Sequence, residues 1–218
     1  MVLVDSQLGG KNSIANLGPV SLNPFALFDL PPAPALDAAA LKERFARETG
    51  ASHPDKFAAS PEAERIAAEE RYADLNRAYQ TLIDPRQRLL CLYELTKGEK
   101  PRDVQRIPPG TMDLFIEVGQ ACQQLDDFLS RKRNSTGALE RAGLMGEELA
   151  LQDTLDAMRL KLDQLAESLE IELARLDMRW RGGDHDLNAL ETVYRKYSYL
   201  SRWKQQLEER EIALLTGE

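Results

Sequence analysis

Hydrophobic residues recur every three or four positions along most of the chain, and no long stretch alternates them with polar residues. This spacing places apolar side chains on one side of an α-helix. The longest such pattern spans residues 147–180, and a second begins at Asp184 or Asp186 and continues to Leu207. The pattern therefore predicts an all-α protein with two long helices near its C-terminal end.

Shorter helical patterns precede the long ones, and residues that favour helix ends separate them. Asn23 and Asp37 are expected to cap the first two helices. Ser60 is expected to cap the third, which ends at an Asp-Pro pair at residues 84–85. A short helix over residues 86–95 follows.

Composition divides the chain into a leader, two helical domains and a linker. Residues 1–22 mix glycine, asparagine and serine with scattered aliphatics, which is typical of a flexible leader. Residues 98–110 are polar and rich in proline, so they are expected to connect a domain over residues 23–97 to one over residues 111–218. In the second domain, a helix ending near Arg133 would close the two long helices into an antiparallel three-helix bundle.

One polar stretch, His53-Pro54-Asp55-Lys56-Phe57, lies between two helical patterns and belongs to neither. Its residues are poorly suited to a hydrophobic core and form no recognisable catalytic set. We interpret it as a loop that contacts another protein. The alternative is a plain turn in which the aspartate caps a helix.

The net charge and the cysteine content exclude several classes of function and location. The formal net charge of −8 argues against nucleic acid as the main partner, because phosphate binding needs a basic surface. Cys91 and Cys122 lack the spacing of a metal site and favour a reducing cytoplasm. No apolar run approaches the roughly 20 residues of a membrane span. Residues 184–186 (Asp-His-Asp) are interpreted as a helix cap rather than a metal site, and we expect no enzyme activity, metal or cofactor.

Five segments of the first domain match one known pattern. They are PFALFDL (24–30), LKERF (41–45), HPDKF (53–57), NRAYQTL (76–82) and DPRQR (84–88). Together they resemble the J-domain of DnaJ-type co-chaperones. The whole chain resembles the HscB-type co-chaperones of iron–sulfur cluster assembly, which join an N-terminal J-domain (a helical hairpin with an HPD loop) to a C-terminal antiparallel three-helix bundle.

The resemblance implies a cytoplasmic co-chaperone that stimulates the ATPase of an HscA/DnaK-type chaperone and delivers an IscU-like iron–sulfur scaffold protein to it. It also implies which residues dock on the chaperone: His53, Pro54, Asp55 and Lys56 of the loop, with Lys42, Arg44 and Arg47 of the preceding helix. The Asp55 carboxylate would pair with an arginine of the chaperone. The basic residues would steer the domain towards an acidic surface.

For the client, the resemblance implies a surface made by Leu114, Phe115 and Ile116 together with Tyr199. Each of these four could instead be ordinary bundle core. Residues 122–124 (Cys-Gln-Gln) stand where the family pattern has an Arg-Glu-Glu segment, so the identity of the client stays open. The alternatives are a J-domain co-chaperone for other clients, or a structural helical adaptor with a vestigial J-domain. Weak homodimerisation is left open as well.

Overall fold

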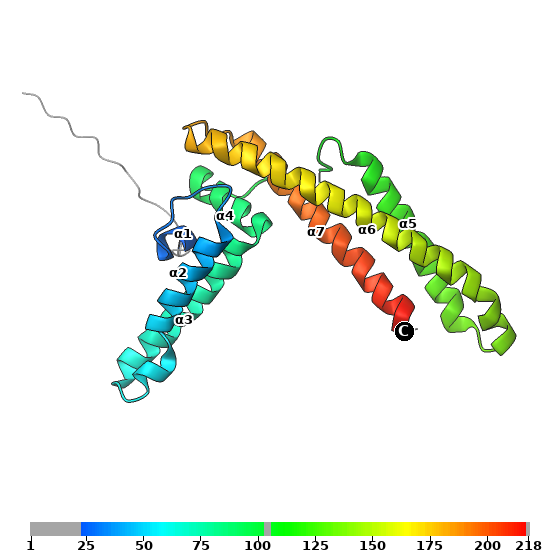
Figure 1. Ribbon diagram of the computed structural model, residues 1–218, viewed down its shortest axis with the longest axis horizontal. Coiled ribbons are helices and arrows are strands. Elements are labelled where there is room, and N and C mark those ends of the chain that lie inside the picture. The colour runs from blue at the N-terminus through cyan, green and yellow to red at the C-terminus, as the bar shows by residue number, and fades with distance from the viewer. Residues whose placement is uncertain (1–22, 103–105, 217–218) are drawn as a thin grey trace, which may run out of the picture.

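The computed structural model describes residues 23–102 and 106–216, and every regular element in this part of the chain is helical (Figure 1). The all-α prediction is therefore confirmed, while the predicted leader lies outside the described residues. In chain order the elements are α1 (Pro24–Leu27), α2 (Ala38–Ala51), the short 3₁₀ turn η1 (Pro54–Phe57), α3 (Glu62–Ile83), α4 (Pro85–Lys97), α5 (Met112–Asn134), α6 (Ala138–Arg181) and α7 (Leu187–Thr216).

Most of the predicted helix caps are present. The side chain of Asn23 accepts a hydrogen bond from a backbone N–H of α1, and that of Asp37 accepts two from α2. The prediction for Ser60 is wrong, because α3 begins only at Glu62 and has no side-chain cap. The backbone N–H of Ser60 instead donates to the carbonyl of Phe57 at 2.9 Å, so Ser60 closes the turn after η1.

Helix α6 is longer than its hydrophobic pattern predicts. It begins at Ala138 instead of residue 147 and contains 44 residues, which corresponds to about 66 Å. Its start is stabilised by Glu140, whose carboxylate accepts hydrogen bonds from two backbone N–H groups, including that of Gly137. The first turns are mostly exposed, Leu139 almost completely, so they lack the buried apolar side that marks a helix in a sequence.

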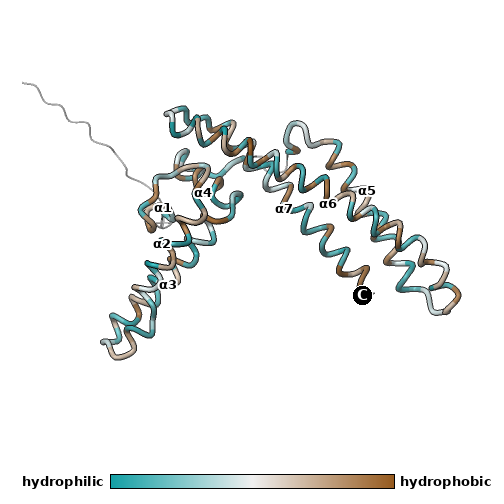
Figure 2. Tube along the Cα trace, viewed as in Figure 1, coloured by the Kyte–Doolittle hydropathy of each residue, from teal (hydrophilic) through white to brown (hydrophobic). Residues whose placement is uncertain are grey.

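Helices α6 and α7 run antiparallel, and α5 packs against both to complete the predicted three-helix bundle (Figure 1). The bundle core is made of apolar side chains from all three helices, including Val118, Leu125, Phe128, Leu155, Leu162, Leu169, Trp203 and Leu207. Polar and apolar segments recur along α6 and α7 in Figure 2, as expected for helices with one buried side. Ion pairs such as Arg210–Asp126 and Lys204–Asp163, both 2.7 Å, tie the helices together at the surface.

Helices α2 and α3 form a hairpin, α1 and α4 pack against α3 at its base, and α4 in turn packs against α7 of the bundle (Figure 1). This base has one continuous hydrophobic core, to which α1–α4 contribute Phe25, Phe28, Leu41, Leu75, Leu82, Leu89, Leu92 and Tyr93, and α6 and α7 contribute Leu173, Leu176, Trp180, Leu190 and Val193. The hairpin and the bundle therefore diverge as two arms from a shared core. Turn η1 lies at the free end of the hairpin arm.

Candidate functional site

The polar stretch singled out in the sequence forms a single tight turn. Pro54 is the first residue of η1, and His53 precedes it in an extended conformation. The Asp55 backbone N–H donates to Nδ1 of His53 at 3.3 Å, and the Lys56 N–H donates to the His53 carbonyl at 3.0 Å. The imidazole is thus bonded to the backbone of the turn, although it is 46% exposed, and the side chain of Asp55 is 90% exposed. The turn presents one carboxylate to solvent on a short, internally bonded frame.

Tyr72 of α3 supports this turn from the hairpin. Its ring meets the His53 imidazole edge to face, with 5.5 Å between the ring centroids and 78° between the planes. The sequence indicates Tyr72 only as part of the apolar side of α3. The position of Tyr72 could have revealed its role. It lies one turn nearer to the loop than Leu75, which is fully buried, so its ring extends beyond the core towards His53.

The predicted basic residues of α2 and η1 divide into two kinds. Lys42, Arg47 and Lys56 are exposed, although Arg47 pairs with its neighbour Glu48. Arg44 is hydrogen bonded within the hairpin base instead, because its Nη1 donates to the carbonyls of Phe28 at 2.6 Å and of Asp29 at 2.9 Å.

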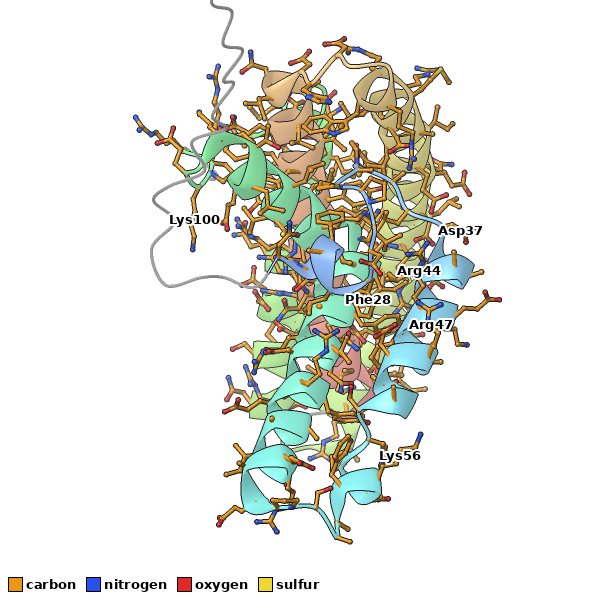
Figure 3. All side chains as sticks on the ribbon, turned by 90° about the vertical axis from the view of Figure 1, so that its left-hand side faces the viewer. Phe28, Asp37, Arg44, Arg47, Lys56 and Lys100 are labelled. Carbon is orange, nitrogen blue, oxygen red and sulfur yellow. The ribbon has the colours of Figure 1, made fainter. Side chains whose placement is uncertain are left out.

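Figure 3 shows Arg44 beside Phe28, with Arg47 farther along α2 and Lys56 near the free end. Asp29 has a φ of +49°, a left-handed conformation that few non-glycine residues adopt. Arg44 therefore secures a strained corner after α1, and its role in docking stays a prediction.

The inner side of α2 is fixed by aromatic contacts. Phe45 stacks on Tyr79 of α3, with 4.2 Å between ring centroids, and meets Phe28 edge to face at 6.5 Å. Glu48 lies 3.2 Å from Arg47 and 3.9 Å from Arg71 of α3. These contacts set which side of α2 faces outward.

The predicted client-contacting residues do not all reach the surface. Phe115 and Ile116 of α5 are 41% and 48% exposed, whereas Leu114 packs partly against the bundle core. Tyr199 is only 4% exposed, so it cannot offer the surface aromatic that the resemblance implies. It is buried because its position on α7 faces α5, where its ring meets Phe115 edge to face at 6.4 Å.

Met112, which the sequence did not single out, extends the exposed apolar surface at the start of α5. It is 52% exposed and lies on the same side of the helix as Ile116, one turn away. We refer to Met112, Phe115 and Ile116 as the Phe115 patch. Tyr199 supports this patch from beneath.

The two cysteines and the Asp-His-Asp segment at residues 184–186 have structural roles. Burial and the nearby Glu94 carboxylate raise the pKa of the Cys91 thiol to about 11, and burial also raises the pKa of Cys122, which makes both poor nucleophiles. Asp186 accepts two backbone hydrogen bonds at the start of α7, as the cap interpretation predicts, and pairs with Arg179. Within residues 23–102 and 106–216, no three potential metal ligands cluster. No helix in this described part is both long and apolar enough to cross a membrane.

The chain matches no model of a known protein family. It is 45% identical over 106 residues to a co-chaperone protein HscB homologue of Mannheimia succiniciproducens, a match that covers 49% of this chain and 61% of the relative. A second homologue of that name, from Shewanella oneidensis, is 29% identical over 194 residues, which cover 89% of this chain and 99% of the relative.

Solved structures have the same fold. The chaperone HscB from Vibrio cholerae superposes with a TM-score of 0.59 and 24% identity, covering 88% of this chain and 99% of the other. The human co-chaperone protein HscB superposes with a TM-score of 0.56 and 18% identity, covering 88% and 83%.

The hairpin with its His-Pro-Asp turn, set on a three-helix bundle, has the fold of a J-domain with an appended helical bundle. Within that class, the relatives confirm the resemblance to HscB-type co-chaperones that the sequence indicates.

Proposed function

We propose that this protein stimulates the ATPase of an HscA/DnaK-type chaperone through η1 and brings an IscU-like iron–sulfur scaffold protein to it on the bundle. The observation that carries the proposal is the Asp55 carboxylate, which is 90% exposed on an ordered turn at the free end of the hairpin. The similarity to two proteins named as HscB co-chaperones supports it. We expect the protein to act in the cytoplasm.

The turn suits a contact that depends on geometry. An arginine fork can hold a carboxylate through two parallel charge-assisted hydrogen bonds. Pro54, the bond to His53 Nδ1 and the Tyr72 ring restrain the turn before binding, which lowers the entropy lost when it docks. Lys56 adds positive charge to the same end and would steer it towards an acidic surface.

The bundle provides the second contact. The Phe115 patch is apolar, exposed and supported by a buried ring, which is the arrangement expected of a protein-binding surface. The hairpin and the bundle share one core, so the two contacts would be held in a defined mutual orientation. In this proposal ATP is hydrolysed by the chaperone, and this chain supplies contacts alone.

Substitution of Asp55 by Asn tests the chaperone contact, because it removes the charge while keeping the size of the side chain. We expect chaperone affinity to fall about 10- to 100-fold, which corresponds to loss of a charge-assisted hydrogen-bonded pair. The measurement is the steady-state ATPase rate of the chaperone as a function of co-chaperone concentration. Asp153→Asn, at an exposed position of α6, is the matched control and should leave stimulation unchanged. Full stimulation by Asp55→Asn would contradict the proposal.

Binding of the purified scaffold protein tests the client contact. Phe115→Ala should weaken binding, whereas Leu160→Ala, which removes an even more exposed apolar side chain from α6, should not. Stimulation of the ATPase without any scaffold binding would favour a J-domain co-chaperone for other clients. Absence of both activities would favour a structural adaptor.

A further inference from the structure

The Phe115 patch borders a cation that no described carboxylate neutralises. Arg202 of α7 is exposed, and the central carbon of its guanidinium lies 5.2 Å from the centroid of the Tyr199 ring. Phe115 meets the same ring from α5, at 6.4 Å between centroids. The apolar patch and the cation therefore flank one buried ring, although they come from helices far apart in the sequence.

Several other charges of the bundle are paired with one another. Glu117 of α5 pairs with Lys161 of α6, and Asp126 pairs with Arg210 of α7. Arg195, two turns before Arg202 on α7, pairs with Glu191. Arg202, in contrast, makes no ion pair among residues 23–102 and 106–216, and it lies over the ring of Tyr199.

Two neutral polar residues follow the patch on the exposed side of α5. Gln120 and Gln123 follow Ile116 at helical spacing, and both are exposed. These two residues add hydrogen-bonding groups without charge, whereas Asp113, between Met112 and Phe115 in the sequence, is exposed and adds a carboxylate. The surface as a whole has an apolar centre, a polar side on α5 that includes one carboxylate, and a cationic edge on α7.

We infer that Arg202 selects the client by charge: the surface fits a scaffold segment that presents apolar side chains next to a carboxylate, and this carboxylate pairs with Arg202. The inference rests on the proposed function, which places the scaffold on this patch. Burial of the apolar centre would exclude water and strengthen a charge pair at its edge. A segment with a basic residue at that place would be repelled, so the cation both favours one client chemistry and disfavours the opposite one.

The test compares affinities of the purified scaffold protein for wild type, Arg202→Glu, Arg202→Lys and the control Arg175→Glu. Arg175 is an exposed, unpaired arginine of α6, about 20 Å along that helix from Lys161, which faces the start of α5. We expect Arg202→Glu to weaken binding about tenfold at low salt, with a smaller effect at about 1 M salt, where charges are screened within a few ångströms. Arg202→Lys, which keeps the charge, and Arg175→Glu should bind nearly as wild type does.

The outcomes separate this inference from the proposed function. If the wild type does not bind the scaffold, the client part of the proposed function fails, and the role of Arg202 fails with it. If Phe115→Ala loses binding but Arg202→Glu does not, the role of Arg202 alone is wrong. Equal weakening by Arg202→Glu and Arg175→Glu, or tighter binding of Arg202→Glu, would likewise overturn it. Arg202→Gln is a further control, because it removes the charge that lies over Tyr199. If its melting temperature equals that of the wild type, a change in binding cannot come from altered packing of Tyr199.

Discussion

Arg44 and Arg47 lie one turn apart on α2, but replacing each by alanine should affect a different property of the protein. Arg44 is hydrogen bonded to two carbonyls at the base of the hairpin, whereas Arg47 is exposed and pairs with its neighbour Glu48. Arg44→Ala removes both bonds and leaves the carbonyls of Phe28 and Asp29 without this partner. We therefore predict that Arg44→Ala mainly affects stability, and Arg47→Ala mainly affects docking on the chaperone.

The size of the effect follows from the two bonds. A hydrogen bond to a charged group contributes about 1.5–3 kcal/mol, and less where water can replace it. Because the Arg44 site is only partly buried and one side chain makes both bonds, we expect the free energy of unfolding to fall by about 1–2 kcal/mol. In a chain of this size that corresponds to a melting temperature lower by about 4 °C. For Arg47→Ala we expect a change within about 0.5 kcal/mol, as for exposed substitutions in general.

Thermal unfolding followed by circular dichroism measures the first effect, and chaperone ATPase stimulation well below the melting temperature measures the second. Arg44→Ala should melt earlier yet still stimulate, and Arg47→Ala should melt as wild type does but need a severalfold higher concentration for half-maximal stimulation. Unchanged melting of Arg44→Ala would refute its structural role. If Arg44→Ala were fully folded but failed to stimulate the ATPase, Arg44 would have a role in docking on the chaperone.

Three further predictions concern the turn, the bundle core and a thiol. Tyr72→Ala should reduce ATPase stimulation severalfold because the ring that restrains His53 is lost; Tyr72→Phe, which keeps the ring, should not, and equal loss in both would refute the role of the ring. Phe128→Ala should lower the free energy of unfolding in urea by about 3–5 kcal/mol because the side chain is fully buried, and a loss below about 1 kcal/mol would contradict that packing. The folded state raises the pKa of Cys91 from 9.0 to about 11 and so holds the proton more tightly than the unfolded chain does. The free energy of unfolding should therefore fall as the pH rises from about 9 to about 11, and Cys91→Ala should lessen this decline; an identical pH profile for the variant would argue against it.

The features predicted correctly from the sequence are those that short segments determine. Asp37 caps α2 by accepting hydrogen bonds from residues two and three positions further along the chain, and the apolar spacing of residues 147–180 marks the buried side of a single helix. The errors occur where the local signal is weak or shared by two structures. A serine before a proline can cap a helix or close a turn, and at Ser60 the preceding 3₁₀ turn decided in favour of the turn. The first turns of α6 extend past the core, so no apolar pattern marks them.

By itself the sequence determined that the protein is all-helical, that HPDKF stands outside the helical pattern, and that the first domain resembles a J-domain. Only the tertiary structure decided that Tyr199 is buried and that Arg202 lies beside the Phe115 patch. The physical reason is that helical spacing reveals which side of a helix is apolar, but not which neighbouring helix covers that side. The packing of α5 against α7 buries one aromatic ring, leaves Phe115 exposed and brings a cation to its edge.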